Sequence, residues 1–171
     1  AGDAVVAWRQ LTQYPGAPGY EYQIFKREYR GRAWTTPSVA DCLSSAGVRA
    51  LLPRLAMDNS GDIVMAWLQE DESDTYQIFR GELRDGVWIL PTGLSDHVSP
   101  DGPDCDYFNE TLYPHEVAMS DEGSAVITWT QDSGIFRSEY RNGSWTKPVD
   151  IYDRINTEDA IAVNPQADMD G

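Results

Sequence analysis

The chain is poor in cysteine, histidine and basic residues, and each shortage excludes a class of protein. Its two Cys and two His, in 171 residues, fit no zinc motif, because such motifs need further ligands at close spacing. Thirteen basic residues stand against 28 acidic ones, and the formal net charge of −15 repels nucleic acid and anionic membrane surfaces. No apolar run approaches the roughly 20 residues of a membrane helix. We therefore expect no nucleic-acid partner and no membrane span.

Recognisable catalytic motifs are missing as well. The sequence has no Gly-x-Ser-x-Gly nucleophile elbow and no His-Glu-x-x-His metal pair. Neither His97 nor His115 has a Ser or Cys partner at a familiar spacing. We assign no catalytic residue and expect a non-enzymatic protein. Paired carboxylates that meet only in the folded chain stay open as an alternative.

Aromatic residues and turn formers are abundant. The chain contains six Trp, nine Tyr, 14 Gly and 10 Pro, a composition that favours an all-β fold with many turns. Three blocks recur in the same order. The first ends in Trp-x-Gln and occupies Ala1–Gln10, Asn59–Gln69 and Asp121–Gln131. The second occupies Gln23–Arg30, Gln77–Arg84 and Gly134–Arg141, and the third, a tight turn followed by Trp, occupies Gly31–Trp34, Asp85–Trp88 and Asn142–Trp145.

The blocks predict strands and hairpins. The first block has a nearly continuous apolar run, typical of a strand covered on both faces. In the second block the side chains alternate, so that Lys26, Glu28 and Arg30 share one face. Asp-Gly and Asn-Gly in the third block favour two-residue hairpins. A further short strand is predicted before each apolar run, at Pro53–Met57, Pro114–Met119 and Pro165–Met169. We expect the six Trp to be core residues wedged between repeats.

The predicted fold is one module, residues 1–171, of four-stranded antiparallel blades of the propeller type. The repeats cover approximately 1–52, 53–113 and 114–164. Residues 165–171 begin a repeat whose continuation is residues 1–10. Met57 precedes Trp67 by ten positions, and Met169 precedes Trp8 by ten if Gly171 is joined to Ala1. The last strand should therefore pair with the first strand of a blade.

Three outcomes of this register stay open. The chain closes on itself, or it donates its last strand to another copy in a dimer or filament, or it is an excerpt of a longer array. Because three blades are fewer than propellers usually have, we favour association or a longer parent chain. The predicted assembly residues are Asn164, Pro165, Gln166, Ala167, Asp168 and Met169 at one end and Ala4, Val5 and Val6 at the other.

Repeats of the type Met-Asp-x-x-Gly-Asp-Ala-Val-Val-Ala-Trp resemble those of bacterial secreted β-propeller proteins of the broad sialidase-like and lectin-like group. The resemblance covers essentially the whole chain. It implies a propeller fold and an extracellular or periplasmic location. The leading interpretation is a module for binding or self-assembly with other copies as partners. A carbohydrate-binding lectin and a sialidase-like glycoside hydrolase fragment are the alternatives.

The connectors between repeats hold the remaining candidate sites. The connector after the second repeat is rich in carboxylates, whose oxygens suit Ca²⁺, so we expect calcium as a candidate cofactor at Asp96, Asp101, Asp104 and Asp106. Cys42 and Cys105 lie in consecutive connectors, and we expect a disulfide between them. An aromatic platform for a glycan or peptide is predicted at Tyr14, Tyr20 and Tyr22. The amides of Gln10, Gln69 and Gln131 either line a ligand site or satisfy backbone groups at the strand ends.

Overall fold

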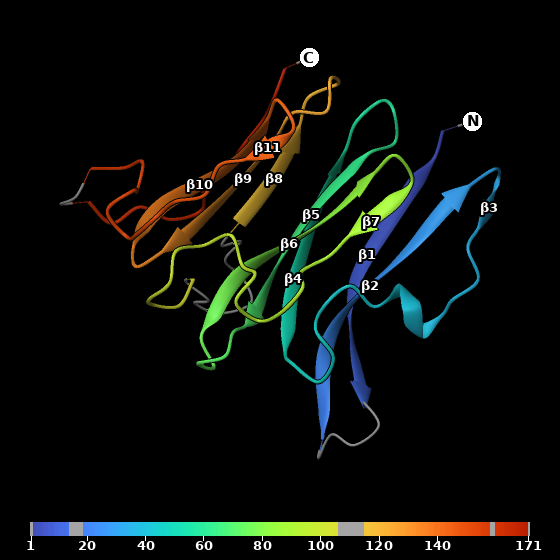
Figure 1. Ribbon diagram of the computed structural model, residues 1–171, viewed down its shortest axis with the longest axis horizontal. Helices are drawn as coiled ribbons and strands as arrows, with labels where there is room; N and C mark the ends of the chain where they lie inside the picture. Colours follow the sequence, from blue (N-terminus) through green and yellow to red (C-terminus); the bar gives the residue numbers. More distant parts are fainter. Residues whose placement is uncertain (1, 14–18, 106–114, 158–159, 171) are drawn as a thin grey trace.

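Three antiparallel sheets follow one another along the chain and lie side by side (Figure 1). The computed structural model of the protein describes residues 2–13, 19–105, 115–157 and 160–170. The first sheet has the order β1-β2-β3, with β1 (Ala4–Gln13), β2 (Tyr20–Arg30) and β3 (Ala33–Trp34). The second has the order β4-β5-β6-β7, with β4 (Ala50–Met57), β5 (Ile63–Glu70), β6 (Tyr76–Arg84) and β7 (Val87–Ile89). The third has the order β8-β9-β10-β11, with β8 (His115–Met119), β9 (Ala125–Gln131), β10 (Gly134–Arg141) and β11 (Ser144–Trp145).

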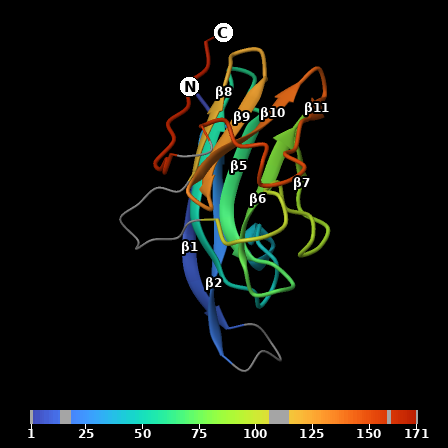
Figure 2. The same ribbon diagram turned by 90° about the vertical axis from the view of Figure 1, so that its left-hand side faces the viewer.

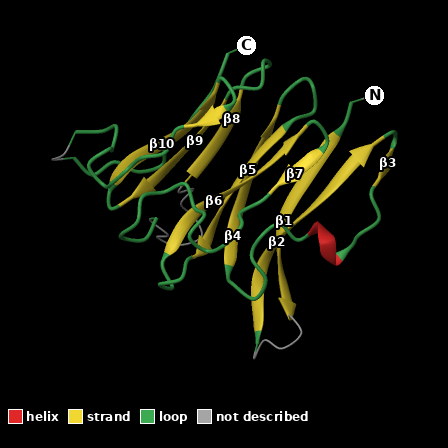
Figure 3. Cartoon of the chain, viewed as in Figure 1, coloured by secondary structure: helices red, strands yellow, loops and turns green. Residues whose placement is uncertain are grey.

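This architecture confirms the predicted all-β class and the meander order of the strands. Figure 3 shows strands throughout and one short 3₁₀ helix, η1 (Val39–Asp41), in the part of the chain that is described. Two sheets have the predicted four strands and the first has three. The sheets form no closed ring within the described residues, so the propeller remains a prediction.

The predicted hairpin turns form where the sequence places them. Asp85 and Gly86 have φ values of 50° and 78°, and the corresponding Asn142 and Gly143 have 53° and 80°. Two consecutive residues at positive φ match the right-handed twist of the flanking strands, which is why Asp-Gly and Asn-Gly are favoured here. The last two strands of the second and third sheets are therefore set by local sequence.

The hydrophobic core lies where the sheets face one another. Residues Ile63 to Leu68 of β5 are fully buried, which confirms the prediction of a strand covered on both faces. The strand β4 packs against β8 and also contacts β1 and β2. The first strand of the second sheet thus lies against both neighbouring sheets. It begins at Ala50, three residues before the predicted Pro53, and contains an irregularity between Leu51 and Arg54.

The predicted third copy of that first strand does not form among the described residues of a single chain. Residues 165–169 belong to no strand, and in the described part of the chain β1 pairs with β2 alone. Figure 1 shows the C-terminal end beside the third sheet and the N-terminal end beside the first, with the second sheet between them. Figure 2 shows both termini at the same end of the strands. The described ends of the chain lie beside opposite outer sheets and do not pair with each other.

Candidate functional site

A row of alternating charged side chains runs along the third strand of the repeat in each sheet. We call this row the ladder. Its members are Lys26, Glu28 and Arg30 on β2, Arg80, Glu82 and Arg84 on β6, and Arg137, Glu139 and Arg141 on β10. In each ladder the central Glu accepts from both basic neighbours, with distances between 2.6 and 3.3 Å. The predicted sharing of one face is therefore confirmed.

The ladder of the first sheet binds the second sheet along a boundary that we call a seam. Trp88 Nε1 donates to Glu28 Oε1 at 2.8 Å, and Lys26 Nζ lies 5.0 Å from the centre of the Trp88 ring. Arg30 Nη2 donates to the carbonyl oxygen of Gly61 at 3.3 Å. Charge-assisted hydrogen bonds and a cation over an indole face are among the stronger polar contacts in proteins. The seam is therefore a specific contact.

The seam between the second and third sheets repeats these contacts. Trp145 Nε1 donates to Glu82 Oε1 at 2.7 Å, and the Arg80 guanidinium lies 4.6 Å from the centre of the Trp145 ring. Arg84 Nη1 donates to the carbonyl oxygen of Gly123 at 3.2 Å. Each seam thus joins the ladder of one sheet to the last-strand Trp and the first-hairpin Gly of the next sheet. The contact has a direction along the chain.

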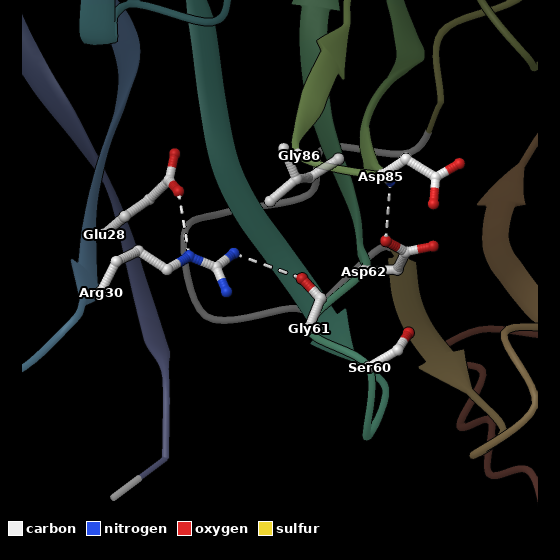
Figure 4. A pocket seen from close by; sticks show the side chains of 8 residues that line it. Glu28, Arg30, Ser60, Gly61, Asp62, Asp85 and Gly86 are labelled. Carbon is white, nitrogen blue, oxygen red and sulfur yellow. Dashed lines mark hydrogen bonds and ion pairs between the residues drawn. The ribbon is translucent and has the colours of Figure 1, made fainter.

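A cavity opens at one end of each seam. The first has a volume of about 510 Å³, and Figure 4 shows Arg30 reaching Gly61 across it while Glu28 accepts from Arg30. On its other side Asp62 accepts from the backbone N–H of Asp85 at 3.1 Å. A cavity of about 440 Å³ lies at the next seam. Arg30 and Arg84 on these walls bind carboxylates of their own sheet, and each also donates to a backbone carbonyl oxygen of the next sheet.

The outer surfaces of the first and third sheets each carry one side of the seam contact, exposed to solvent. On the third sheet the side chains of Arg137, Glu139 and Arg141 are 52%, 25% and 58% exposed, against 28%, 5% and 13% for the ladder of the second sheet. On the first sheet Trp34, which corresponds to Trp88 and Trp145, is 45% exposed. The prediction that all six Trp are core residues is wrong for Trp34, because no sheet in the described part of the chain covers it.

Two ladder carboxylates, Glu28 and Glu139, have a pKa below the usual value for Glu. Burial alone raises the pKa of Glu28, but hydrogen bonds from Lys26, Trp88 and Arg30 outweigh it and hold the pKa below its usual value. The hydrogen bond from Arg141 is the main cause that lowers the pKa of Glu139, and Arg137 adds to it against the opposing effect of burial. The exposed ladder therefore presents an ionised acceptor at neutral pH.

The Gln residues of Trp-x-Gln also act at the seams. In each repeat the indole N–H of the Trp donates to the amide oxygen of the Gln, at 3.2 to 3.3 Å. Gln69 also bonds Ser45 in the preceding connector, and Gln131 donates to the carbonyl oxygens of Pro100 and Pro103. Gln69 and Gln131 are fully buried, whereas Gln10 is exposed. These contacts support the structural alternative for the amides.

The predicted calcium residues do not converge in the described residues. Asp96 accepts from the backbone N–H and the hydroxyl of Thr92, and Asp104 accepts from the backbone N–H of Tyr76 at 2.6 Å. Asp101 is 94% exposed and lies 3.3 Å from His97. Within the described ranges no group of three or more His, Cys, Asp or Glu could hold a metal ion. Asp106 lies outside those ranges, so calcium binding stays a prediction.

The predicted disulfide between Cys42 and Cys105 is not formed. Cys42 forms a bridge to Phe25 in the first sheet, and Cys105 forms one to Gln131 in the third. The thiols lie near Gln23 and Gln77 respectively. Consecutive connectors are fixed to different sheets, which keeps the two cysteines apart.

The predicted aromatic platform is described in part. Tyr20 is 61% exposed at the start of β2. Two residues on, Tyr22 lies under the Arg9 guanidinium, 4.9 Å from its ring centre, and packs against the hydrophobic core. Tyr14 lies outside the described residues. Tyr20 and Tyr22 share a face of β2, and glycan or peptide binding there stays a prediction.

One pair of hydrogen bonds, which ties each connector to the second-block strand, was not predicted from the sequence. After the last strand of each repeat, an apolar residue donates its backbone N–H to the second-block strand at 2.8 Å, in Leu43, Val98 and Ile155. The next residue, Ser44, Ser99 or Asn156, accepts from a backbone N–H of that same strand. The signal in the sequence is an apolar residue followed by a small polar one, which is too common to be recognised unaided.

Comparisons with known proteins add little. No protein-family model and no curated protein matches the chain. Among solved structures, a fucose lectin from Kordia zhangzhouensis in complex with methyl-fucoside is similar over 86% of this chain and 91% of that chain, at 11% identity and a TM-score of 0.41. No helix among the described residues is long and apolar enough to cross a membrane.

Proposed function

We propose that this chain is a non-enzymatic assembly module, in which residues 165–170 of one copy pair with β1 of another. One observation carries the proposal. In the second and third sheets an additional strand, β4 or β8, pairs with the strand that corresponds to β1. The first sheet has no such strand among the described residues, so β1 is its edge strand. Residues 165–169 repeat the sequence of those strands and pair with no described strand of their own chain. An edge strand with unpaired backbone groups is a ready template for such an addition.

The exposure of β1 agrees with a missing neighbour. Val6 corresponds to Met65 and Ile127, because each precedes the repeated Trp by two positions. Met65 and Ile127 are fully buried, whereas Val6 is 48% exposed. Leaving apolar surface in water costs about 25 cal/mol per Å². Addition of a strand beside β1 would cover this surface and bond its free edge.

The internal sheets define the register of the proposed pairing. Leu55 lies opposite Met65 in the second sheet, and Val117 lies opposite Ile127 in the third. Transferred to the ends of the chain, this register places Ala167 of one copy opposite Val6 of the next. Two copies paired in this way contain six four-stranded sheets, which is within the usual range of four to eight blades in a propeller. We propose this closed dimer as the functional unit.

The mass in solution tests the proposal. Sedimentation equilibrium over a range of concentrations should show a species of about 38 kDa, twice the chain mass of 19.1 kDa. Removal of residues 163–171 should leave a folded monomer, while Tyr152→Ala, a change at a residue that is 71% exposed in the last connector, should leave association intact. A full chain that sediments as a monomer at every concentration contradicts the proposal.

A further inference from the structure

We infer that the outer surfaces of the first and third sheets bind each other between two copies of the chain through the same side-chain contacts that form the internal seams. This inference rests on the proposed assembly and names its specificity-determining residues. Trp34 of one copy donates to Glu139 of the other, and its ring lies against Arg137. Arg141 donates to the carbonyl oxygen of Gly2.

The partner follows from the direction of the seam. The first two ladders each bind a Trp that lies one repeat further along the chain, as Glu28 binds Trp88 and Glu82 binds Trp145. Among the described residues, Glu139 of the third ladder accepts from no Trp of a following repeat, and Trp34 of the first sheet donates to no ladder Glu of a preceding repeat. A surface with the same spacing of donor and acceptor satisfies both, and the chain itself carries that surface.

The hydrogen bond from the ladder Arg to a backbone carbonyl oxygen also joins one repeat to the next along the chain. Gly61 and Gly123 accept from Arg30 and Arg84, and each Gly precedes the repeated Trp by six positions. Gly2 precedes Trp8 by the same six positions. Arg141, 58% exposed, is the ladder residue that corresponds to Arg30 and Arg84.

All the missing contacts belong to one interface. The copy that supplies residues 165–170 to a neighbouring β1 also supplies Arg137, Glu139 and Arg141, and the neighbour supplies Trp34 and Gly2. The exposed Gln10 corresponds to Gln69 and Gln131, which bind the preceding connector, so Gln10 faces the last connector of the other copy. Strand, ladder and amide therefore point to a single relative placement of the two chains.

A double-mutant cycle at the ends of the molecule tests the inference. The dissociation constant of the full chain is measured by dilution for the wild type, Trp34→Phe, Glu139→Gln and the double variant. Each single change removes one partner of a charge-assisted hydrogen bond, so each should weaken association about tenfold or more. The double variant should be no weaker than the worse single variant, because the two changes remove the same contact. Circular dichroism verifies that all four chains are folded.

The equivalent internal pair is the matched control. Trp145→Phe and Glu82→Gln should lower the thermal midpoint of the chain and leave the dissociation constant within about threefold of the wild type. Association that is unchanged in Trp34→Phe and Glu139→Gln overturns the inference and leaves the proposed function standing. A wild-type chain that stays monomeric overturns both. Loss of monomer stability in Trp34→Phe with no dependence on concentration would place the contact within one chain and overturns it too.

Discussion

The strands β5 and β1 have nearly the same sequence and differ in their surroundings. From Ile63 to Leu68, β5 is fully buried between β4 and β6, whereas β1 pairs with β2 alone among the described strands and leaves Val6 48% exposed. The same difference separates the ladder of the second sheet from that of the third. The burial of a repeat is therefore decided by its neighbours, and each outer sheet has a neighbour on one side only among the described residues.

Removing the repeated Trp should show the largest difference between the two strands. Trp67 is fully buried, while Trp8 is half-buried. Trp67→Ala should lower the free energy of unfolding by about 3–5 kcal/mol, the usual cost of a large core truncation. Trp8→Ala, measured by chemical denaturation at a concentration that keeps the chain monomeric, should cost about half as much. Equal losses at both positions would contradict the view of β1 as an uncovered strand.

The closed seam between the second and third sheets should be sensitive to acid through His115. This residue begins β8, and its complete burial, with a smaller effect of Arg54, lowers its pKa from 6.5 to about 4. The unfolded chain therefore takes up the proton first as the pH falls. The free energy of unfolding should decrease between about pH 6.5 and pH 4, by up to about 3 kcal/mol. In the His115→Leu variant the free energy of unfolding should depend less on pH in this range. An unchanged pH dependence, measured by chemical denaturation at a series of pH values, would contradict the role of His115.

One residue of the donated segment departs from its internal counterparts. Asp168 stands where β4 has Ala56 and β8 has Ala118, the latter only 7% exposed. Pairing with β1 would move this carboxylate out of water, which is unfavourable without a partner. Asp168→Ala should therefore tighten association about tenfold, or about 1.4 kcal/mol. Asp170→Ala serves as the control. If Asp168→Ala tightens association no more than Asp170→Ala does, the proposed register is contradicted.

The smallest expected effect concerns the hairpin of the first sheet. Its turn is Gly31-Arg32, with Arg32 at a φ of 69°, whereas the other two sheets have Gly at that position. Arg32→Gly relieves the strain of a side chain in the left-handed region, partly offset by the greater freedom of Gly in the unfolded chain. We expect a gain of about 0.5 kcal/mol in the free energy of unfolding. A destabilised variant in thermal unfolding would show that the Arg32 side chain contributes more than its backbone strain costs.

Local patterns in the sequence predicted the local structure well. Alternation in the second block placed the ladders on one face, and Asp85-Gly86 and Asn142-Gly143 placed two hairpins, because these features depend on neighbouring residues alone. Predictions that depend on a distant partner fared differently. Trp34 and residues 165–169 have the sequence of buried elements, but no described part of their own chain covers them. A repeat pattern alone does not predict which elements lie together in space. The predicted disulfide between Cys42 and Cys105 does not form, because backbone bonds hold the two connectors against different sheets.

Cross-linking between copies tests the central claim most directly. Chains carrying Val6→Cys are mixed with chains carrying Ala167→Cys and oxidised. Both chains also carry Cys42→Ser, whereas Cys105 is kept because it is fully buried. The proposed register places these two positions opposite each other, so a disulfide-linked dimer of the two different chains should form. With Gln166→Cys in place of Ala167→Cys the side chain points to the other face, and cross-linking should be much weaker. No linked dimer, or equal yields from positions 166 and 167, would contradict strand exchange at this edge.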